Sequence, residues 1–491
     1  MPIARTNVGH GNGEQGNDEE QKDDASRGDA VALGTPQATG ILAASIVGSG
    51  MAQLDATVVN VALERIGRDL TASLETLQWV VNGYMLALSA LILLGGSLGD
   101  LFGRRRLFSL GVVVFALASV VCGLAPGSGV LIAARVAQGI GGAMLAPASL
   151  AMLQGAFRAR DRGHAIGTWP SLGSVAGLLG PLVGGALVQF ASWRWAFWIN
   201  VPLALVALWA ARRFVPESRA PHRARIDVPG AVLAAATLAG LTLALIMPGS
   251  AWALPGWIVA GVGAVAFVLV ERRVRAPMVP PGLFADRTFT GANAMTLLTY
   301  AGMGAMSFFL SLQLQVSLGW GALWAGLAQL PTSVCMILLA GRFGALASRR
   351  GPRAFMTVGP LVAALGVLVL SLARRGDTYL WPVLPGVILF GLGLAVFVAA
   401  LTSTALAAAP DENAGIASGV NNAVARTGSL LAVAALPALV GLSGRAYSDP
   451  ALMTDGFQRG LWIAAGLMAL GGATAWATTP SGPMETGGAE G

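Results

Sequence analysis

Two ionisable side chains lie inside long apolar stretches of the sequence, Asp55 and Arg135. Asp55 lies about eight residues from the end of its stretch, roughly 12 Å deep at the helical rise, and Arg135 lies about six residues in from the same face, at a comparable depth. Burial disfavours a charged carboxylate and a nearby cation favours it, so such a pair can switch the ionisation of Asp55 as its surroundings change. The alternative is a permanent ion pair that only ties two helices together.

A third buried charge is Arg426, about twelve residues into another apolar stretch and so near the middle of a helix that crosses a membrane. A cation at that depth needs an anion, an acidic ligand group or an internal partner. Asp55 is the only acid expected at comparable depth. The sequence therefore favours neutral, weakly cationic or zwitterionic amphipathic ligands over lipophilic cations.

The stretch 95–106 reads Gly-Gly-Ser-Leu-Gly-Asp-Leu-Phe-Gly-Arg-Arg-Arg, between two long apolar stretches. A helix that ends in three arginines indicates the cytoplasmic face of a membrane. Asp100 must find water or a partner there. The arginines are one partner, and the positive end of the helix that starts near Ala414 and Gly415 is another.

Composition sets the class of protein. Apolar residues make up 55% of the 491 residues and charged residues 11%, against about 25% charged in soluble domains. These values predict a polytopic membrane protein. The net charge of +7 comes from arginines in short loops, which indicates membrane orientation and not nucleic-acid binding.

The sequence offers no cofactor chemistry. The last lysine is Lys22, so the apolar region has no lysine-bearing phosphate-binding loop. Cys122 and Cys335 lie in apolar stretches without metal or disulfide spacing, and three histidines are scattered. We expect no cofactor and no metal.

About fourteen apolar stretches are long enough to cross a bilayer as helices. Their approximate bounds are 39–63, 77–99, 107–125, 129–152, 164–190, 194–214, 228–248, 252–270, 289–313, 321–346, 354–373, 379–402, 414–442 and 456–478. Alternate loops are rich in arginine, which predicts that these loops and both termini are cytoplasmic. The fold class is thus an all-α membrane protein in the cell membrane.

An internal repeat predicts the domain organisation. Residues 96–105 align with 344–353, Gly-Ala-Leu-Ala-Ser-Arg-Arg-Gly-Pro-Arg, and Ser348 there replaces the acid. Two related halves with a site at their interface are typical of transporters. The expected parts are a polar tail (1–37), a six-helix half (38–216), a linker with two extra helices (217–275), a second six-helix half (276–479) and a polar tail (480–491).

Five stretches in order resemble one known family. They are 54–63 (Leu-Asp-Ala-Thr-Val-Val-Asn-Val-Ala-Leu), 96–105, 135–142 (Arg-Val-Ala-Gln-Gly-Ile-Gly-Gly), the glycine-rich 173–185 and 193–202 (Trp-Arg-Trp-Ala-Phe-Trp-Ile-Asn-Val-Pro). Between its tails the sequence resembles the fourteen-span drug:proton antiporter branch of the major facilitator superfamily. The family's first-helix motif usually continues with proline, where this chain has Glu64.

The resemblance implies proton-coupled efflux of hydrophobic drugs or antibiotics across the cytoplasmic membrane by alternating access. Its partners would be a small hydrophobic molecule, protons and the lipid bilayer, with the protein a monomer. The alternative is export of an endogenous lipid or metabolite on the same fold. An enzyme or sensor would need a catalytic cluster or a soluble domain, and the sequence contains neither.

The resemblance also implies roles for residues. Proton coupling falls to Asp55 and Arg135, and an outward-open state would be stabilised by a conformational latch of Gly96, Asp100, Gly103 and Arg104. Small residues one turn apart let helices approach closely, and a proline permits a bend; the expected hinge is Gly173, Gly177, Gly180, Pro181 and Gly184, with ordinary tight packing as the alternative. Candidates for the substrate cavity are Asn82, Gln138, Trp169, Tyr300, Gln313, Asn421 and Arg426.

Overall fold

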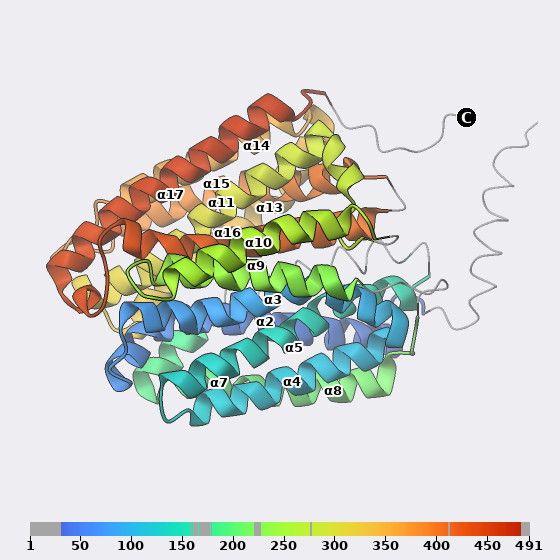
Figure 1. Ribbon diagram of the computed structural model, residues 1–491, viewed down its shortest axis with the longest axis horizontal. Helices are drawn as coiled ribbons and strands as arrows, with labels where there is room; N and C mark the ends of the chain where they lie inside the picture. Colours follow the sequence, from blue (N-terminus) through green and yellow to red (C-terminus); the bar gives the residue numbers. More distant parts are fainter. Residues whose placement is uncertain are drawn as a thin grey trace, which may run out of the picture.

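The computed structural model describes residues 31–158, 161, 165, 177, 179–219, 227–274, 277–410 and 413–482. The predicted site residues Gly173 and Trp169 lie outside them. The described chain is almost entirely helical, and its long helices run roughly side by side (Figure 1). It divides into an N-terminal bundle, a helical hairpin and a C-terminal bundle.

The N-terminal bundle contains the first two ionisable residues noted above. Its first helix begins after Thr35, whose side chain accepts a hydrogen bond from the Ala38 amide, with Pro36 in the first turn. The helices are α2 (Pro36–Asp69), α3 (Leu74–Phe102), α4 (Arg104–Leu124), α5 (Ser128–Ala156), the Leu179–Phe190 helix, α7 (Trp195–Trp198) and α8 (Asn200–Phe214).

The hairpin consists of α9 (Val228–Ile246) and α10 (Ala253–Glu271). A Cβ on Gly240 would lie 2.7 Å from the Gly256 carbonyl oxygen, so the two helices pack backbone against backbone. In Figure 1 the hairpin lies between the two bundles, and α9 contacts both α3 and α16 (Ala414–Leu439). The inserted helices therefore pack along the line where the bundles meet.

The C-terminal bundle completes the chain. Its elements are η1 (Pro281–Ala285), α11 (Arg287–Leu312), η2 (Gln313–Ser317), α12 (Ala322–Leu327), α13 (Leu330–Arg350), α14 (Arg353–Leu370), α15 (Val383–Ala407), α16, η4 (Ala446–Ser448) and α17 (Pro450–Thr478). The η2 segment is a π-helical continuation of α11.

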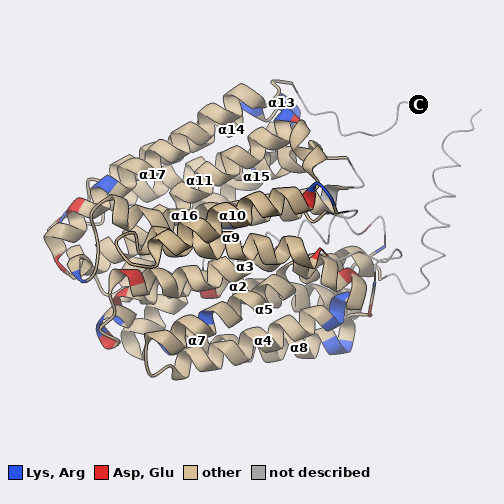
Figure 2. Ribbon diagram, in the orientation of Figure 1, with Lys and Arg blue, Asp and Glu red and all other residues tan. Residues whose placement is uncertain are grey.

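The hydropathy prediction is confirmed where it can be compared. The described residues contain 13 helices that are long and apolar enough to cross a membrane. The remaining predicted span, 164–190, is described mainly over its last part, the apolar Leu179–Phe190 helix. Charged residues gather at the two ends of the helices, and the middles are almost free of charge (Figure 2).

The repeated stretches adopt the same backbone turn. Helix α3 ends before Gly103 at φ 111°, and α13 ends before Gly351 at φ 89°. Glycine occupies such positive φ values without the strain that a Cβ would add. The turn glycines stand 248 residues apart, like Gly96 and Gly344 in the sequence alignment (351 − 103 and 344 − 96). The two copies thus share geometry as well as composition.

The two bundles are hydrogen-bonded to each other at one end. Within the described residues, all hydrogen bonds between the two bundles lie at the end opposite Arg104–Arg106. The donors are the side chains of Gln78, Ser311, Gln315, Tyr447 and Arg445 and the backbone amides of Leu74, Leu323 and Gly444. Gln78, for example, donates to the carbonyl oxygens of Val433 at 2.7 Å and Ala434 at 2.9 Å. The molecule is therefore closed at this end.

Candidate functional site

Asp55 on α2 and Arg135 on α5 form a buried ion pair. The Arg135 Nη1 donates to Asp55 Oδ2, and the two residues are 1% and 0% exposed, respectively. The pairing predicted from their depths in the sequence is thus present. Charges removed from water require both a counter-ion and further hydrogen bonds, because desolvation is expensive.

Neutral polar groups supply those further hydrogen bonds. Asp55 Oδ1 accepts from Gln138 Nε2 at 3.2 Å and from Asn200 Nδ2 at 3.0 Å. Ser119 Oγ on α4 accepts from the same Gln138 amide at 2.7 Å and lies 3.3 Å from Asn200 Nδ2. The carboxylate is therefore held by groups from three other helices, α4 indirectly and α5 and α8 directly.

Arg135 is fixed from its other side by backbone and aromatic rings. Its Nε donates to the Val80 carbonyl oxygen at 3.0 Å, and its guanidinium lies 4.5 Å from the centre of the Tyr84 ring. These contacts require α3 and α5 to approach closely. Gly139 permits this approach, because a Cβ there would lie 2.8 Å from that of Ala87.

The arrangement has a simple chemical property. All the direct partners of the Asp55 carboxylate are donors, one charged and two neutral. Adding a proton to the carboxylate would remove its ionic attraction to Arg135 while leaving the neutral donors in place. Protonation would therefore weaken the contact between α2 and α5 selectively.

The predicted latch residues lie together at the arginine-rich end. Arg104 donates to Asp100 Oδ1 from Nη2 at 2.9 Å and from Nε at 3.0 Å, and its Nη1 reaches the Ala151 carbonyl oxygen at 3.1 Å. The described residues show no hydrogen bond between Asp100 and the start of α16. The predicted contact with that helix stays a prediction.

Glu217 is a further member of this cluster, and sequence reasoning missed it. Its Oε1 accepts from the Arg105 amide at 3.1 Å, and its Oε2 lies 3.6 Å from Arg105 Nε and 3.7 Å from Arg106 Nε. A Cβ on Gly103 would lie 2.6 Å from Glu217 Oε1. The signal available in the sequence was an isolated acid, Glu217, just after the last helix of the first half.

The described part of the glycine-rich helix is closely packed. A Cβ on Gly180 would collide with the Thr57 side chain on α2, and one on Gly184 would lie 2.7 Å from Val58 Cγ1. A Cβ on Gly326 of α12 would collide with the Pro181 carbonyl oxygen. The Leu179–Phe190 helix therefore also packs against the C-terminal bundle. A Cβ on Gly177, in contrast, would meet nothing within 4 Å among the described residues.

The substrate-cavity candidates separate into two groups. Gln138 belongs to the Asp55 cluster, Gln313 donates to Ala373 O and Thr454 Oγ1, and Asn421 donates to Asn293 and Thr296 within the C-terminal bundle. These amides already have partners. Their part in a cavity stays a prediction, and packing explains their present positions.

The second group lies where the bundles meet and lacks partners. Among the described residues, neither the Nδ2 nor the Oδ1 of Asn82 has a hydrogen-bond partner, although Asn82 is 0% exposed, and the buried Nε of Arg426 also lacks one. Arg426 interacts electrostatically with the hydroxyls of Tyr84 and Tyr300. Buried polar groups without partners are costly, and the part of these residues in a substrate cavity stays a prediction.

Asn200 and Ser119 were also missed as functional residues. Asn200 belongs to the 193–202 stretch, and its amide in an apolar helix was the signal that could have identified it. In the described residues no three His, Cys, Asp or Glu side chains gather as a metal site would require.

Comparison with known proteins identifies the family. The Major Facilitator Superfamily model matches residues 46–433. The chain belongs to the Major Facilitator Superfamily. It is a membrane transporter and not an enzyme, as the sequence predicted.

Similar superfamily members are named for antibiotic resistance or export. The puromycin resistance protein of Streptomyces alboniger is 36% identical, over 86% of this chain and 88% of that protein. The multidrug resistance protein Stp of Mycobacterium tuberculosis is 35% identical, over 84% of this chain and 77% of its own length. The tetracenomycin C resistance and export protein of Streptomyces glaucescens is 35% identical, over 81% of this chain and 75% of its own length.

Solved structures show the same fold at low sequence identity. A bacterial homologue of the lysosomal transporter Spinster, in an inward-facing conformation, has a TM-score of 0.66 at 17% identity and covers 90% of this chain and 97% of its own. A peptide transporter bound to sulfate has a TM-score of 0.69 at 15% identity, with 93% of this chain and 97% of that chain covered.

Proposed function

We propose that this transporter exports hydrophobic antibiotics or drugs across the cytoplasmic membrane in exchange for protons, by alternating access of two six-helix halves, 38–216 and 276–479. The observation that carries the proposal is the buried Asp55–Arg135 pair with its shell of neutral donors. The names of the similar proteins support antibiotics as the substrate class.

The orientation follows from charge. Arginine-rich loops lie on the cytoplasmic side of most membrane proteins, so Arg104–Arg106 mark the cytoplasmic end. The described chain begins at Val31, whose amide bonds Ala156 O, and ends near Gly351, both at that same end. The closed end is then the outer one, and the present conformation is open toward the cytoplasm.

A transport cycle can be derived from these contacts. Substrate enters from the cytoplasmic side and lies between the bundles near Asn82 and Arg426, whose polar atoms lack partners. A proton arriving at Asp55 from outside neutralises the carboxylate and loosens α2 from α5. Deprotonation toward the cytoplasm restores the ion pair and resets the transporter. In the outward-open state the Asp100 latch would engage the start of α16.

The test is efflux in a bacterial host that lacks its own pumps. Cells that produce the protein should tolerate puromycin and other lipophilic antibiotics better, and a protonophore should abolish the difference. Asp55→Asn should remove efflux, because the amide cannot exchange a proton. Asp455→Asn, which changes an exposed acid near the start of α17 in the C-terminal bundle, is the control. Efflux by Asp55→Asn equal to that of the unaltered protein would overturn the coupling role.

A further inference from the structure

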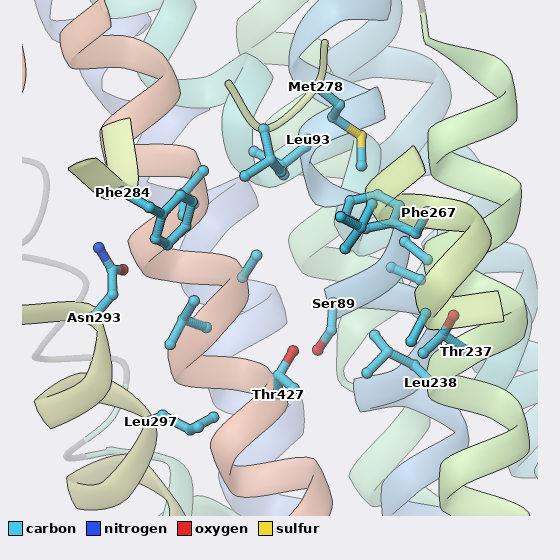
Figure 3. A pocket seen from close by; sticks show the side chains of 18 of the residues that line it. Ser89, Leu93, Thr237, Leu238, Phe267, Met278, Phe284, Asn293, Leu297 and Thr427 are labelled. Atoms are coloured by element: carbon cyan, nitrogen blue, oxygen red, sulfur yellow. The ribbon is translucent and has the colours of Figure 1, made fainter. Parts of the chain in front are cut away.

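A cavity of about 530 Å³ lies between the inserted hairpin and the line where the two bundles meet (Figure 3). Its walls come from α3, α9, α10, α11 and α16, so the N-terminal bundle, the hairpin and the C-terminal bundle all contribute. The lining is almost wholly apolar and includes Leu93, Leu238, Phe267, Met278 and Leu297. The volume falls within the roughly 300–1,000 Å³ of pockets that hold drug-sized molecules.

One buried polar atom in this cavity lacks a partner. Ser89 on α3 is 5% exposed, its Oγ has no hydrogen-bond partner among the described residues, and Ser89 and Thr427 on α16 both line the cavity (Figure 3). The other buried polar side chain of the lining, Asn293, is bonded to Phe289 O and Asn421. A hydroxyl buried without a partner costs free energy that a ligand with a polar group would recover.

Asn82 and Arg426, the unpartnered polar residues between the bundles, do not line this cavity but lie close to it along α3 and α16. Ser89 follows Asn82 by seven residues, two helical turns, so the two side chains share a face of α3. Gln78 bonds Val433 and Ala434, and Leu93 lies against Gly419. The helices α3 and α16 therefore run antiparallel, and the residue numbers at the same level of the two helices add to about 512. Arg426 is therefore level with the part of α3 between Asn82 and Ser89, and it is adjacent in the chain to Thr427 of the cavity lining.

We propose that this cavity is a lateral entry site, where a compound dissolved in the bilayer binds before it moves between the bundles. The occupant is a drug-sized apolar molecule with one hydroxyl or carbonyl group, which bonds Ser89 and Thr427. This inference rests on the proposed function and adds the route and the substrate class. It also assigns a role in substrate entry to the inserted hairpin, because α9 and α10 form the outer wall of the site.

The position of Ser89 distinguishes this occupant from a membrane phospholipid. Ser89 lies in the middle of α3, far from both helix ends. A phospholipid acyl chain carries only hydrocarbon at that depth of the bilayer, and its polar groups lie at the surface. An acyl chain could fill the cavity but would leave the Ser89 hydroxyl without a partner. A compound whose polar group lies within its apolar body satisfies both.

The test uses the full protein in lipid vesicles and a photoreactive probe, a trifluoromethyl-phenyldiazirine that carries one hydroxymethyl group. Peptide mass spectrometry should locate cross-links on cavity residues such as Phe267 and Met278, and an excess of the same alcohol without the diazirine should remove them. Ser89→Ala should weaken labelling about threefold to tenfold, the range expected for one hydrogen bond. Ala264→Trp, which fills the cavity from α10, should abolish it.

Val265→Trp is the matched control, because Val265 is 62% exposed and does not line the cavity. Labelling and antibiotic efflux should both stay normal in this variant, whereas Ala264→Trp should lose both. Uniform labelling around α10 that the alcohol does not remove, or efflux by Ala264→Trp equal to the control, would overturn the entry site while leaving the proposed function intact. Saturable labelling without efflux of any compound would overturn the function and keep the binding site.

Discussion

Asn200 donates a hydrogen bond of 3.0 Å to Asp55 Oδ1 and so ties α8 to α2 at the buried ion pair. This contact makes the sixth apolar stretch of the sequence part of the charged cluster, although it contributes no charge itself. Asn200 Oδ1 has no partner, so the amide is held only through its donor. The orientation of the Asp55 carboxylate therefore depends on Asn200 together with Gln138.

Asn200→Leu should lower both stability and transport. The substitution removes donors to Asp55 and Ser119, and we expect the free energy of unfolding to fall by about 1–3 kcal/mol. Thermal unfolding in detergent measures the first effect, and antibiotic efflux in cells the second. Thr474→Val is the control, because Thr474 is only half-buried and its hydrogen bond goes to the Leu470 carbonyl oxygen of its own helix. An Asn200→Leu protein as active as this control would contradict the orienting role.

Gln78→Leu should favour opening of the closed end. The variant loses two hydrogen bonds to α16, worth about 1–3 kcal/mol together. Spin labels at Leu124 and Leu380, exposed positions at that end of the two bundles, should report a larger population of long distances. The labels require a background without Cys122 and Cys335. An unchanged distance distribution would show that the Gln78 bonds do not hold the bundles together.

Asp100→Asn should slow transport and leave substrate binding nearly unchanged. The Asp100–Arg104 pair is partly exposed, so its loss should cost at most about 1 kcal/mol of stability. The measurements are initial efflux rates and equilibrium binding of a transported antibiotic. Ser348→Ala, at the matching position of the second copy, is the control. Lost binding in Asp100→Asn would contradict its assignment as a latch residue.

The glycine-rich helix should respond differently at two positions. Gly180→Val should destabilise the protein, because a side chain there collides with Thr57. Gly177→Leu should be tolerated in folding, since none of the described residues lies within 4 Å of a Cβ there, and should reduce efflux if this glycine acts in a hinge. Protein yield and thermal stability, measured beside efflux, separate the two effects. Normal efflux by a well-folded Gly177→Leu protein would exclude the hinge.

The sequence was sufficient to predict features that depend on position along the chain. Span lengths follow from hydropathy, and the meeting of Asp55 with Arg135 follows from their matched depths. Features that depend on helix rotation were not accessible. Asn200 was missed because only the orientation of α8 about its axis decides whether its amide faces Asp55 or lipid.

Residues outside the helices were equally hard to predict. Glu217 reaches Gly103 because the chain folds back after α8, and no local pattern specifies that path. Gln313 was expected in a cavity, yet the π-helical turn of η2 places it beside Ala373 and Thr454. The depth of a polar residue along a membrane-spanning helix can thus be predicted from the sequence. The direction in which its side chain points depends on tertiary packing and cannot.

The closed end has a consequence for sequence variation. Most acceptors there are main-chain oxygens, such as those of Val433, Ala434, Asn60 and Val61, which every amino acid supplies. Substitution at these positions would leave the acceptors in place. The residues that supply these main-chain acceptors could therefore vary among related transporters without loss of the hydrogen bonds. Only the residues whose side chains donate, such as Gln78 and Gln315, would need to be conserved.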